Sequence, residues 1–210
     1  MPGQPLNSTG KTYLRIVNGS WAQTVDKGTE GAKLREYEGK NGQKGSKWEL
    51  YFSSWTGRIH TIEFRENEFG IQCLINVGDA VLTLPTDSRY FADLASKLPS
   101  ANLAKDLTFH PFNMDTETGK KVGISLQQDG VKLKNFYWDG TKKLHGYPEV
   151  DETKKSKNGY WKFYFAEVSE FLISELHKLK ITKTVGDASE KEIQELMSDE
   201  LMDPKTDLPF

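Results

Sequence analysis

Lysines and large aromatic residues alternate along one short stretch of this chain, VKLKNFYW at residues 131–138. Successive side chains of a β-strand point to opposite faces, so a strand here places two lysines and two aromatic rings together. These residues are Lys132, Lys134, Phe136 and Trp138. Lysines neutralise phosphates and aromatic rings stack on unpaired bases, each stacked base contributing about 1–3 kcal/mol. The pattern is therefore typical of a surface that binds single-stranded nucleic acid.

A second stretch, KWELYFSSW at residues 47–55, alternates in the same way. The pattern predicts that its apolar side faces the core. Tyr51 and Trp55 share the opposite face with Glu49 and are candidate stacking platforms. Aromatic residues on strands are also common packing residues. Burial of the same rings in a core therefore stays open as an alternative.

Further cations and one more aromatic complete the candidate surface. Tyr13 and Arg15 lie together on the outward side of a predicted strand over residues 12–21, and residues 26–46 form a glycine-rich, cation-bearing loop or loose hairpin. The candidate contacts to single-stranded DNA are Tyr13, Arg15, Lys33, Arg35, Lys47, Tyr51, Trp55, Arg58, Lys132, Lys134, Phe136 and Trp138.

Catalytic motifs are not apparent in the sequence. The four histidines are scattered without the spacing of a metal site, and no nucleophile elbow, phosphate-binding loop or dinucleotide fingerprint occurs. We therefore expect a binding protein without catalytic residues, cofactor or metal. A carboxylate-based nuclease site hidden among the 30 acids stays open.

The predicted elements describe a β-rich (α+β) chain of about eight strands and two helices. Strands are expected over residues 12–21, 47–55, 57–66, 69–84, 106–115, 121–128 and 131–138. Helices are expected over 87–98 and 165–179, residues 160–165 fit either a strand or a helix start, and 139–159 is a second lysine-rich loop. These elements predict an enlarged OB-like curved sheet or barrel with inserted helices.

Length and composition restrict the class of protein further. A chain of 210 residues suits one elaborated domain, and no stretch approaches the roughly 18 apolar residues of a membrane span. The first residues contain no apolar signal core, and the single Cys73 lies in an apolar run without an internal partner. A reducing, cytoplasmic location without membrane attachment is the expectation.

Charge is distributed unevenly along the chain. Residues 187–210 carry eight acids and two bases, so residues 1–186 carry 26 bases and 22 acids. A mildly basic body is thus joined to an acidic end, which favours a polyanionic partner for the body.

The chain closes with the residues KTDLPF, and this end looks like a peptide ligand for another protein. Residues 188–202 fit a short amphipathic helix, for which packing on the domain is the alternative. After Pro204 such a helix does not readily continue. Phe210 can fill an apolar pocket, its carboxylate and Asp207 can meet a basic rim, and Pro209 limits the entropy lost on docking.

The acidic end with its tip Asp207, Leu208, Pro209 and Phe210 resembles the tail of bacterial single-stranded DNA-binding proteins, which ends in Asp-Ile-Pro-Phe. Phage-encoded proteins of this kind also end in acidic segments, often with a terminal Phe. The resemblance implies coverage of single strands by the body, recruitment of a polymerase, helicase or nuclease by the tip, and electrostatic competition between tail and DNA. At Lys205 and Thr206 the tip departs from the bacterial pattern, which has acids there, so a dedicated phage partner stays open.

Together these observations predict a phage-type single-stranded DNA-binding protein that acts in DNA replication, recombination or repair. Residues 1–10 would be a disordered lead, 11–180 the OB-like domain and 181–210 a flexible partner-binding tail. If phage-encoded, it would work in the bacterial host cytoplasm, as a monomer or a homodimer. A carbohydrate-binding β module, whose exposed rings stack on sugars, and a replication nuclease are the alternatives.

Overall fold

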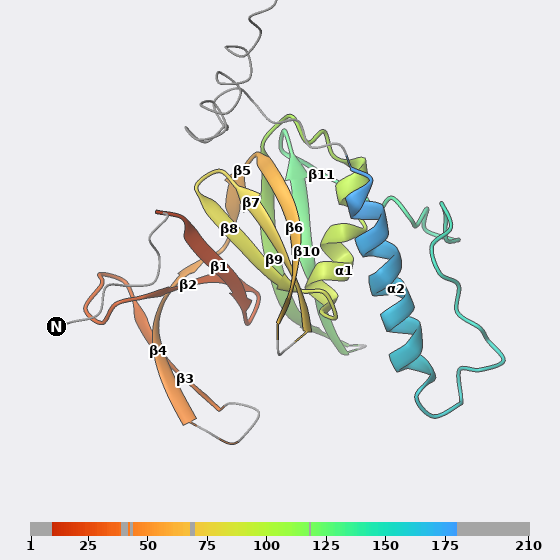
Figure 1. The fold of residues 1–210 in the computed structure, drawn as a ribbon, viewed down its shortest axis with the longest axis horizontal. Coiled ribbons are helices and arrows are strands. Elements are labelled where there is room, and N and C mark those ends of the chain that lie inside the picture. The colour runs from red at the N-terminus through yellow and green to blue at the C-terminus, as the bar shows by residue number, and fades with distance from the viewer. Residues whose placement is uncertain (1–9, 39–41, 43, 68–69, 118, 180–210) are drawn as a thin grey trace, which may run out of the picture.

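The computed structural model describes residues 10–38, 42, 44–67, 70–117 and 119–179, which form two β-sheets and two α-helices around one core (Figure 1). The first sheet has the order β3-β4-β2-β1-β8-β7-β6. Its strands are β1 (Thr12–Val17), β2 (Ser20–Val25), β3 (Lys33–Glu38), β4 (Lys44–Phe52), β6 (Ile59–Asn67), β7 (Gly70–Val77) and β8 (Ala80–Pro85). The second sheet, β11-β10-β9-β5, contains β5 (Trp55–Gly57), β9 (Leu107–Thr116), β10 (Gly119–Gln128) and β11 (Val131–Lys132).

The core lies between the two sheets and extends under the helices α1 (Arg89–Ala95) and α2 (Tyr160–His177). Leu14, Trp21 and Leu82 enter it from the first sheet, and Phe109 and Leu126 enter it from the second. The Trp21 indole N–H donates to the backbone oxygen of Phe109 over 3.0 Å, which ties the two sheets together at their centre. Burial of such large apolar side chains is the main favourable term in the folding free energy.

Helix α1 packs against the second sheet, and α2 packs against α1 on the outside of the molecule (Figure 1). Ser88 caps α1 by accepting a 3.1 Å hydrogen bond from the backbone N–H of Phe91, as its sequence position predicts. A short 3-10 turn, Leu98–Ser100, follows α1 and contains Pro99. Asp93 of α1 and Lys97, two residues beyond the end of α1, also bind the edge of β10 at Ile124: Asp93 accepts from its N–H over 2.7 Å, and Lys97 donates to its oxygen over 2.7 Å.

Two long strand predictions are wrong because tight turns divide them. Residues 12–21 form the hairpin β1–β2, whose turn residues Asn18 and Gly19 both have positive φ, of 48° and 80°. Such a turn follows the right-handed twist of its flanking strands. Residues 69–84 are likewise divided into β7 and β8 at Gly78, with a φ of 58°.

Of the two alternatives predicted for residues 26–46, a loop or a loose hairpin, the hairpin is confirmed, since β3 pairs antiparallel with β4 in regular register. The prediction of a strand over 131–138 is wrong beyond Lys132. There the chain leaves the sheet and turns at Asn135, whose side chain accepts from the Tyr137 N–H over 2.8 Å. This turn inserts the Tyr137 ring into the core.

Helix α2 begins at Tyr160, directly after Gly159 in a left-handed conformation, which confirms the second of the two alternatives for residues 160–165, a strand or a helix start. Residues 160–165 are therefore helical rather than a last strand. The helix buries Tyr164, Val168, Leu172 and Leu176, whereas Phe165 is 57% exposed.

The expected β-rich class with helices is confirmed. Within the described residues the two sheets stay separate and do not close into a barrel. No helix in this part of the chain is both long and apolar enough to cross a membrane.

Candidate nucleic-acid interface

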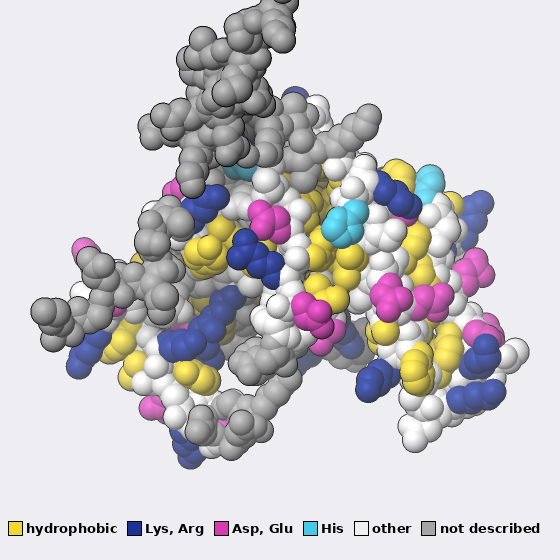
Figure 2. Space-filling view, viewed as in Figure 1, with side chains coloured by type: hydrophobic (Ala, Val, Ile, Leu, Met, Phe, Trp, Pro, Cys, Tyr) yellow, Lys and Arg dark blue, Asp and Glu magenta, His cyan; other side chains and the backbone are white. Residues whose placement is uncertain are grey.

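The register of the first sheet gathers six of the twelve candidate contacts on one face. Residues directly opposite each other on paired strands point to the same side of a sheet. The pairs that connect the strands are Arg15 with Ala22, Ala22 with Tyr51, Lys33 with Glu49 and Arg35 with Lys47. We call this surface of β1 to β4 the cationic face; its candidate contacts are Tyr13, Arg15, Lys33, Arg35, Lys47 and Tyr51. Figure 2 shows basic side chains gathered over the part of the molecule where these strands lie.

Two aromatic rings of the cationic face are open to solvent: Tyr13 is 45% exposed and Tyr51 36%. Strand β2, which lies between the strands that carry them, contributes only the small side chains Ser20, Ala22 and Thr24 to this face. A hollow of about 230 Å³ results, lined by Tyr13, Arg15, Ala22 and Thr24 among others. The face therefore offers two exposed rings and a hollow beside one of them, Tyr13.

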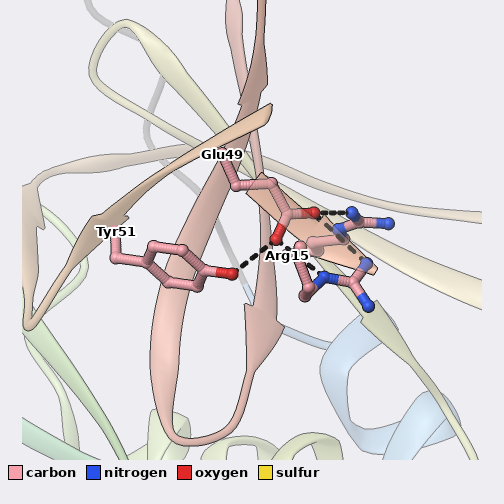
Figure 3. Close-up of polar contacts among 4 residues, drawn as sticks. Arg15, Glu49 and Tyr51 are labelled. Atoms are coloured by element: carbon pink, nitrogen blue, oxygen red, sulfur yellow. Dashed lines mark hydrogen bonds and ion pairs between the residues drawn. The ribbon is translucent and has the colours of Figure 1, made fainter. Parts of the chain in front are cut away.

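Glu49 lies at the centre of the cationic face, and its side chain is completely buried. It accepts hydrogen bonds from Arg15 Nη2, from Arg35 Nε over 2.8 Å and from the Tyr51 hydroxyl over 2.7 Å. Arg35 Nη2 adds a further bond of 3.2 Å, which makes its contact bidentate. Tyr51 and Arg15 approach the carboxylate from opposite sides (Figure 3).

Burial alone would raise the pKa of the Glu49 carboxyl, because it disfavours the charged form. The hydrogen bonds from Arg35, Tyr51 and Arg15 outweigh burial and lower the pKa to about 2. The same contact with Glu49 raises the pKa of Arg35. At neutral pH the group is therefore two guanidinium cations around one carboxylate.

This arrangement fixes the direction of two arginines that come from different strands. Arg15 reaches across β2, and Arg35 reaches across from the edge strand β3, to meet on the same carboxylate. A guanidinium group has five N–H donors, so donors remain for a ligand after Glu49 is bound. With Lys33 and Lys47 included, the formal charge of the face is +3.

Tyr37 also lies on the cationic face, although it is not among the residues predicted from the sequence. The guanidinium carbon of Arg35 and the Lys47 Nζ lie 5.2 and 5.3 Å from its ring centroid. Its ring covers Gly45 on β4, where an added Cβ would come within 2.6 Å of Tyr37 Cζ. The alternation in KLREYE (33–38) could have revealed it, had these residues not been assigned to a loop.

The other six candidates lie apart from the cationic face. Trp55 belongs to the second sheet, is partly buried against the core and packs edge-to-face on Phe52 with centroids 5.5 Å apart. Arg58 is half-buried between β5 and β6. Neither extends the row that contains Tyr51, because β4 ends at Phe52 and the chain passes into the other sheet.

The lysine and aromatic ladder predicted over residues 131–138 does not form, because only its first two residues are in a strand. Phe136 is stacked on His145 with centroids 4.1 Å apart and packs against the core. Trp138 is 44% exposed but forms an isolated bridge with Lys143, away from β11. Lys132 and Lys134 are exposed.

The predicted partner-binding residues Asp207, Leu208, Pro209 and Phe210 lie outside the described residues. Among the described residues, no group of three or more histidines, cysteines or acids is placed to hold a metal ion. Comparisons of the chain with protein-family models, with curated proteins and with solved structures find no match.

Proposed function

We propose that this protein binds single-stranded DNA on the cationic face, without strong sequence preference, in replication, recombination or repair. The observation that carries the proposal is the combination of two exposed rings, Tyr13 and Tyr51, with arginines held around the buried Glu49. A site that binds single strands of any sequence needs two kinds of group: cations that bind the phosphates of the backbone, and aromatic rings on which any base can stack.

The geometry favours a single strand over duplex DNA. In a duplex the bases are stacked on each other, so flat rings on a sheet surface have no base to contact. Phosphate contacts alone would still bind duplex, but they would leave Tyr13 and Tyr51 unused. The cations among the rings also favour a charged polymer over a neutral sugar, for which exposed aromatic rings alone would suffice.

We further propose that strands β5 to β10 form an enlarged, open relative of the OB barrel. In support, the two sheets share one core without closing, and a helix is inserted between consecutive strands β8 and β9. Strands β1 to β4 would then be an addition that extends the sheet and carries the cationic face.

A titration of tryptophan and tyrosine fluorescence with oligothymidylate tests the proposal. We expect quenching and tight binding with the single strand, weaker binding with duplex of the same length, and an affinity that falls as salt rises. Tyr51→Leu should reduce the affinity about five- to tenfold, the loss of one stacked base. Equal affinity for duplex, or binding of a neutral oligosaccharide instead, would contradict the proposal.

A role of the C-terminal tip in recruiting a replication polymerase, helicase or nuclease is a separate part of the proposal. It is supported by the tip sequence Asp207 to Phe210. Deletion of these four residues should abolish binding to the replication partner in a two-component assay and leave the affinity for oligothymidylate unchanged. A truncated protein that still binds its partner would refute this role.

A further inference from the structure

The outward face of the hairpin β9–β10 is a second surface where aromatic and cationic side chains meet. Phe109 and Leu126 point into the core, so the alternate residues of both strands point outward. The outward pairs are His110 with Ser125, Phe112 with Gly123, and Met114 with Lys121. This side of the second sheet is therefore neither a plain apolar face nor a plain charged one.

A hollow of about 560 Å³ lies on this face, and we call it the β9–β10 hollow. Three lysines are among its lining residues: Lys97, Lys121 and Lys132. Lys97 is held in place by Asp93 at 2.6 Å and by the backbone oxygen of Ile124 at 2.7 Å. Lys121 and Lys132 are exposed and can meet an incoming anion.

Phe112 supplies a flat ring beside these lysines. Its ring covers Gly123 on the neighbouring strand, where an added Cβ would come within 2.9 Å of Phe112 Cζ. The tip of the ring therefore lies next to the backbone of β10, beside the Asp93 carboxylate that holds Lys97, and the residue lines the hollow. An aromatic ring with lysines around it supplies the two kinds of group that bind a single strand, one for a base and one for phosphates.

The turn of the hairpin that carries part of the cationic face contacts β9, one of the two strands that form the β9–β10 hollow. An added Cβ on Gly19, in the β1–β2 turn, would come within 2.6 Å of the backbone nitrogen of Asn113 and 3.1 Å of the Phe112 carbonyl carbon. Strands β1 and β9 belong to the two sheets that enclose the same core, so their outward faces point away from each other. A strand bound along Tyr13 and Arg15 therefore reaches Phe112 only if it is long enough to pass around the β1–β2 turn.

We propose that the β9–β10 hollow is a second subsite for the same single strand, with Phe112 stacking a base and Lys121 and Lys132 binding phosphates. This inference rests on the proposed function and extends it. The first nucleotides occupy the cationic face, and only a longer strand reaches the hollow. The subsite thus contributes to affinity in a way that depends on the length of the strand.

The test compares two neighbouring lysines of β10 that differ in the face they occupy. Lys121 lines the hollow, whereas Lys120 is exposed on the other side of the same strand and is the matched control. The full-length variants Lys121→Ala, Lys132→Ala and Lys120→Ala are titrated with oligothymidylates of about 6 and about 16 nucleotides, which bracket single-strand site sizes.

With the longer strand, Lys121→Ala and Lys132→Ala should each lose about three- to tenfold in affinity and lower the salt slope by about 0.7. The shorter strand should bind all three variants like the wild-type protein. Equal losses for Lys120→Ala and Lys121→Ala would show an effect of net charge alone and would overturn the subsite. Wild-type protein that binds neither strand would instead overturn the proposed function itself.

Discussion

At the scale of single residues, Glu49 presents an apparent contradiction, since an acid occupies the centre of a surface proposed to bind a polyanion. Its contacts explain its presence there. It accepts hydrogen bonds from Arg15 on β1, Arg35 on β3 and Tyr51 on β4. These bonds fix the orientation of the three side chains. Pre-organised cations lose less conformational entropy when a ligand binds. Glu49 is therefore a positioning residue.

Glu49→Gln should weaken the binding of single-stranded DNA about three- to tenfold, because a neutral amide holds the two guanidinium groups less firmly. Simple electrostatics predicts the opposite sign, since the substitution removes a negative charge from the face. Glu36→Gln is the matched control, because it makes the same charge change on the opposite face of β3. Affinities for oligothymidylate from fluorescence titration decide between the weaker binding expected from lost positioning and the tighter binding expected from the removed charge. Tighter binding by Glu49→Gln would refute the positioning role.

The lowered pKa of Glu49 also predicts how stability depends on pH. The pKa falls from 4.5 to about 2 on folding, so the ionised carboxylate stabilises the folded state above pH 4.5. This contribution, on the order of 3 kcal/mol, is lost as pH falls from about 4.5 to about 2. Urea unfolding of wild-type and Glu49→Gln proteins should therefore give free energies that converge in this window. A difference that does not change with pH would contradict the assignment.

At the scale of elements, alternation in the sequence correctly assigned the outward faces of β1 and β4, and thereby Tyr13, Arg15 and Tyr51. Such patterns depend only on the two-residue period of a strand. They did not reveal the burial of Glu49, because burial of a charge depends on partners from β1 and β3. The turn at Asn18–Gly19 was missed although the alternation shifts by one residue there: Leu14 and Trp21, seven residues apart, both point into the core.

The prediction over residues 131–138 failed because the core overrides a local pattern. Alternation assigned Phe136 and Trp138 to a ligand-binding face, but the chain turns at Asn135 and Tyr137 enters the core. Phe136 then stacks on His145 from the following loop. The residues of 131–138 by themselves do not indicate that Phe136 and Tyr137 pack against the core and against the loop that follows them.

The β1–β2 hairpin connects the two sheets at its turn, and a glycine is required there for two reasons. Gly19 has a φ of 80°, and an added Cβ would come within 2.6 Å of the Asn113 nitrogen. Gly19→Ala should reduce the free energy of unfolding by about 2 kcal/mol or more, from backbone strain and the clash with β9. Gly28→Ala is the control, because Gly28 has a φ of 95° but open space around it. Urea unfolding should show a clearly larger loss for Gly19→Ala, and equal losses would mean that the contact with β9 is unimportant.

At the scale of the whole molecule, two charged parts have opposite signs. The chain has a formal charge of −2, and without residues 187–210 it has a charge of +4. The cationic face therefore belongs to a body whose attraction for polyanions is partly cancelled by the charge of the rest of its own chain. Long-range attraction of this kind acts mainly on the rate of association and is screened within about 8 Å at physiological salt.

A protein truncated after Gly186 should associate with oligothymidylate faster than the full chain at low salt, and the difference should disappear as salt rises. A full-length variant with all eight acids of residues 187–210 replaced by their amides separates charge from chain length. If charge is the cause, stopped-flow fluorescence should give this variant the association rate of the truncated protein. A rate equal to that of the wild-type chain would mean that the acidic segment acts by occupying space rather than through its charge.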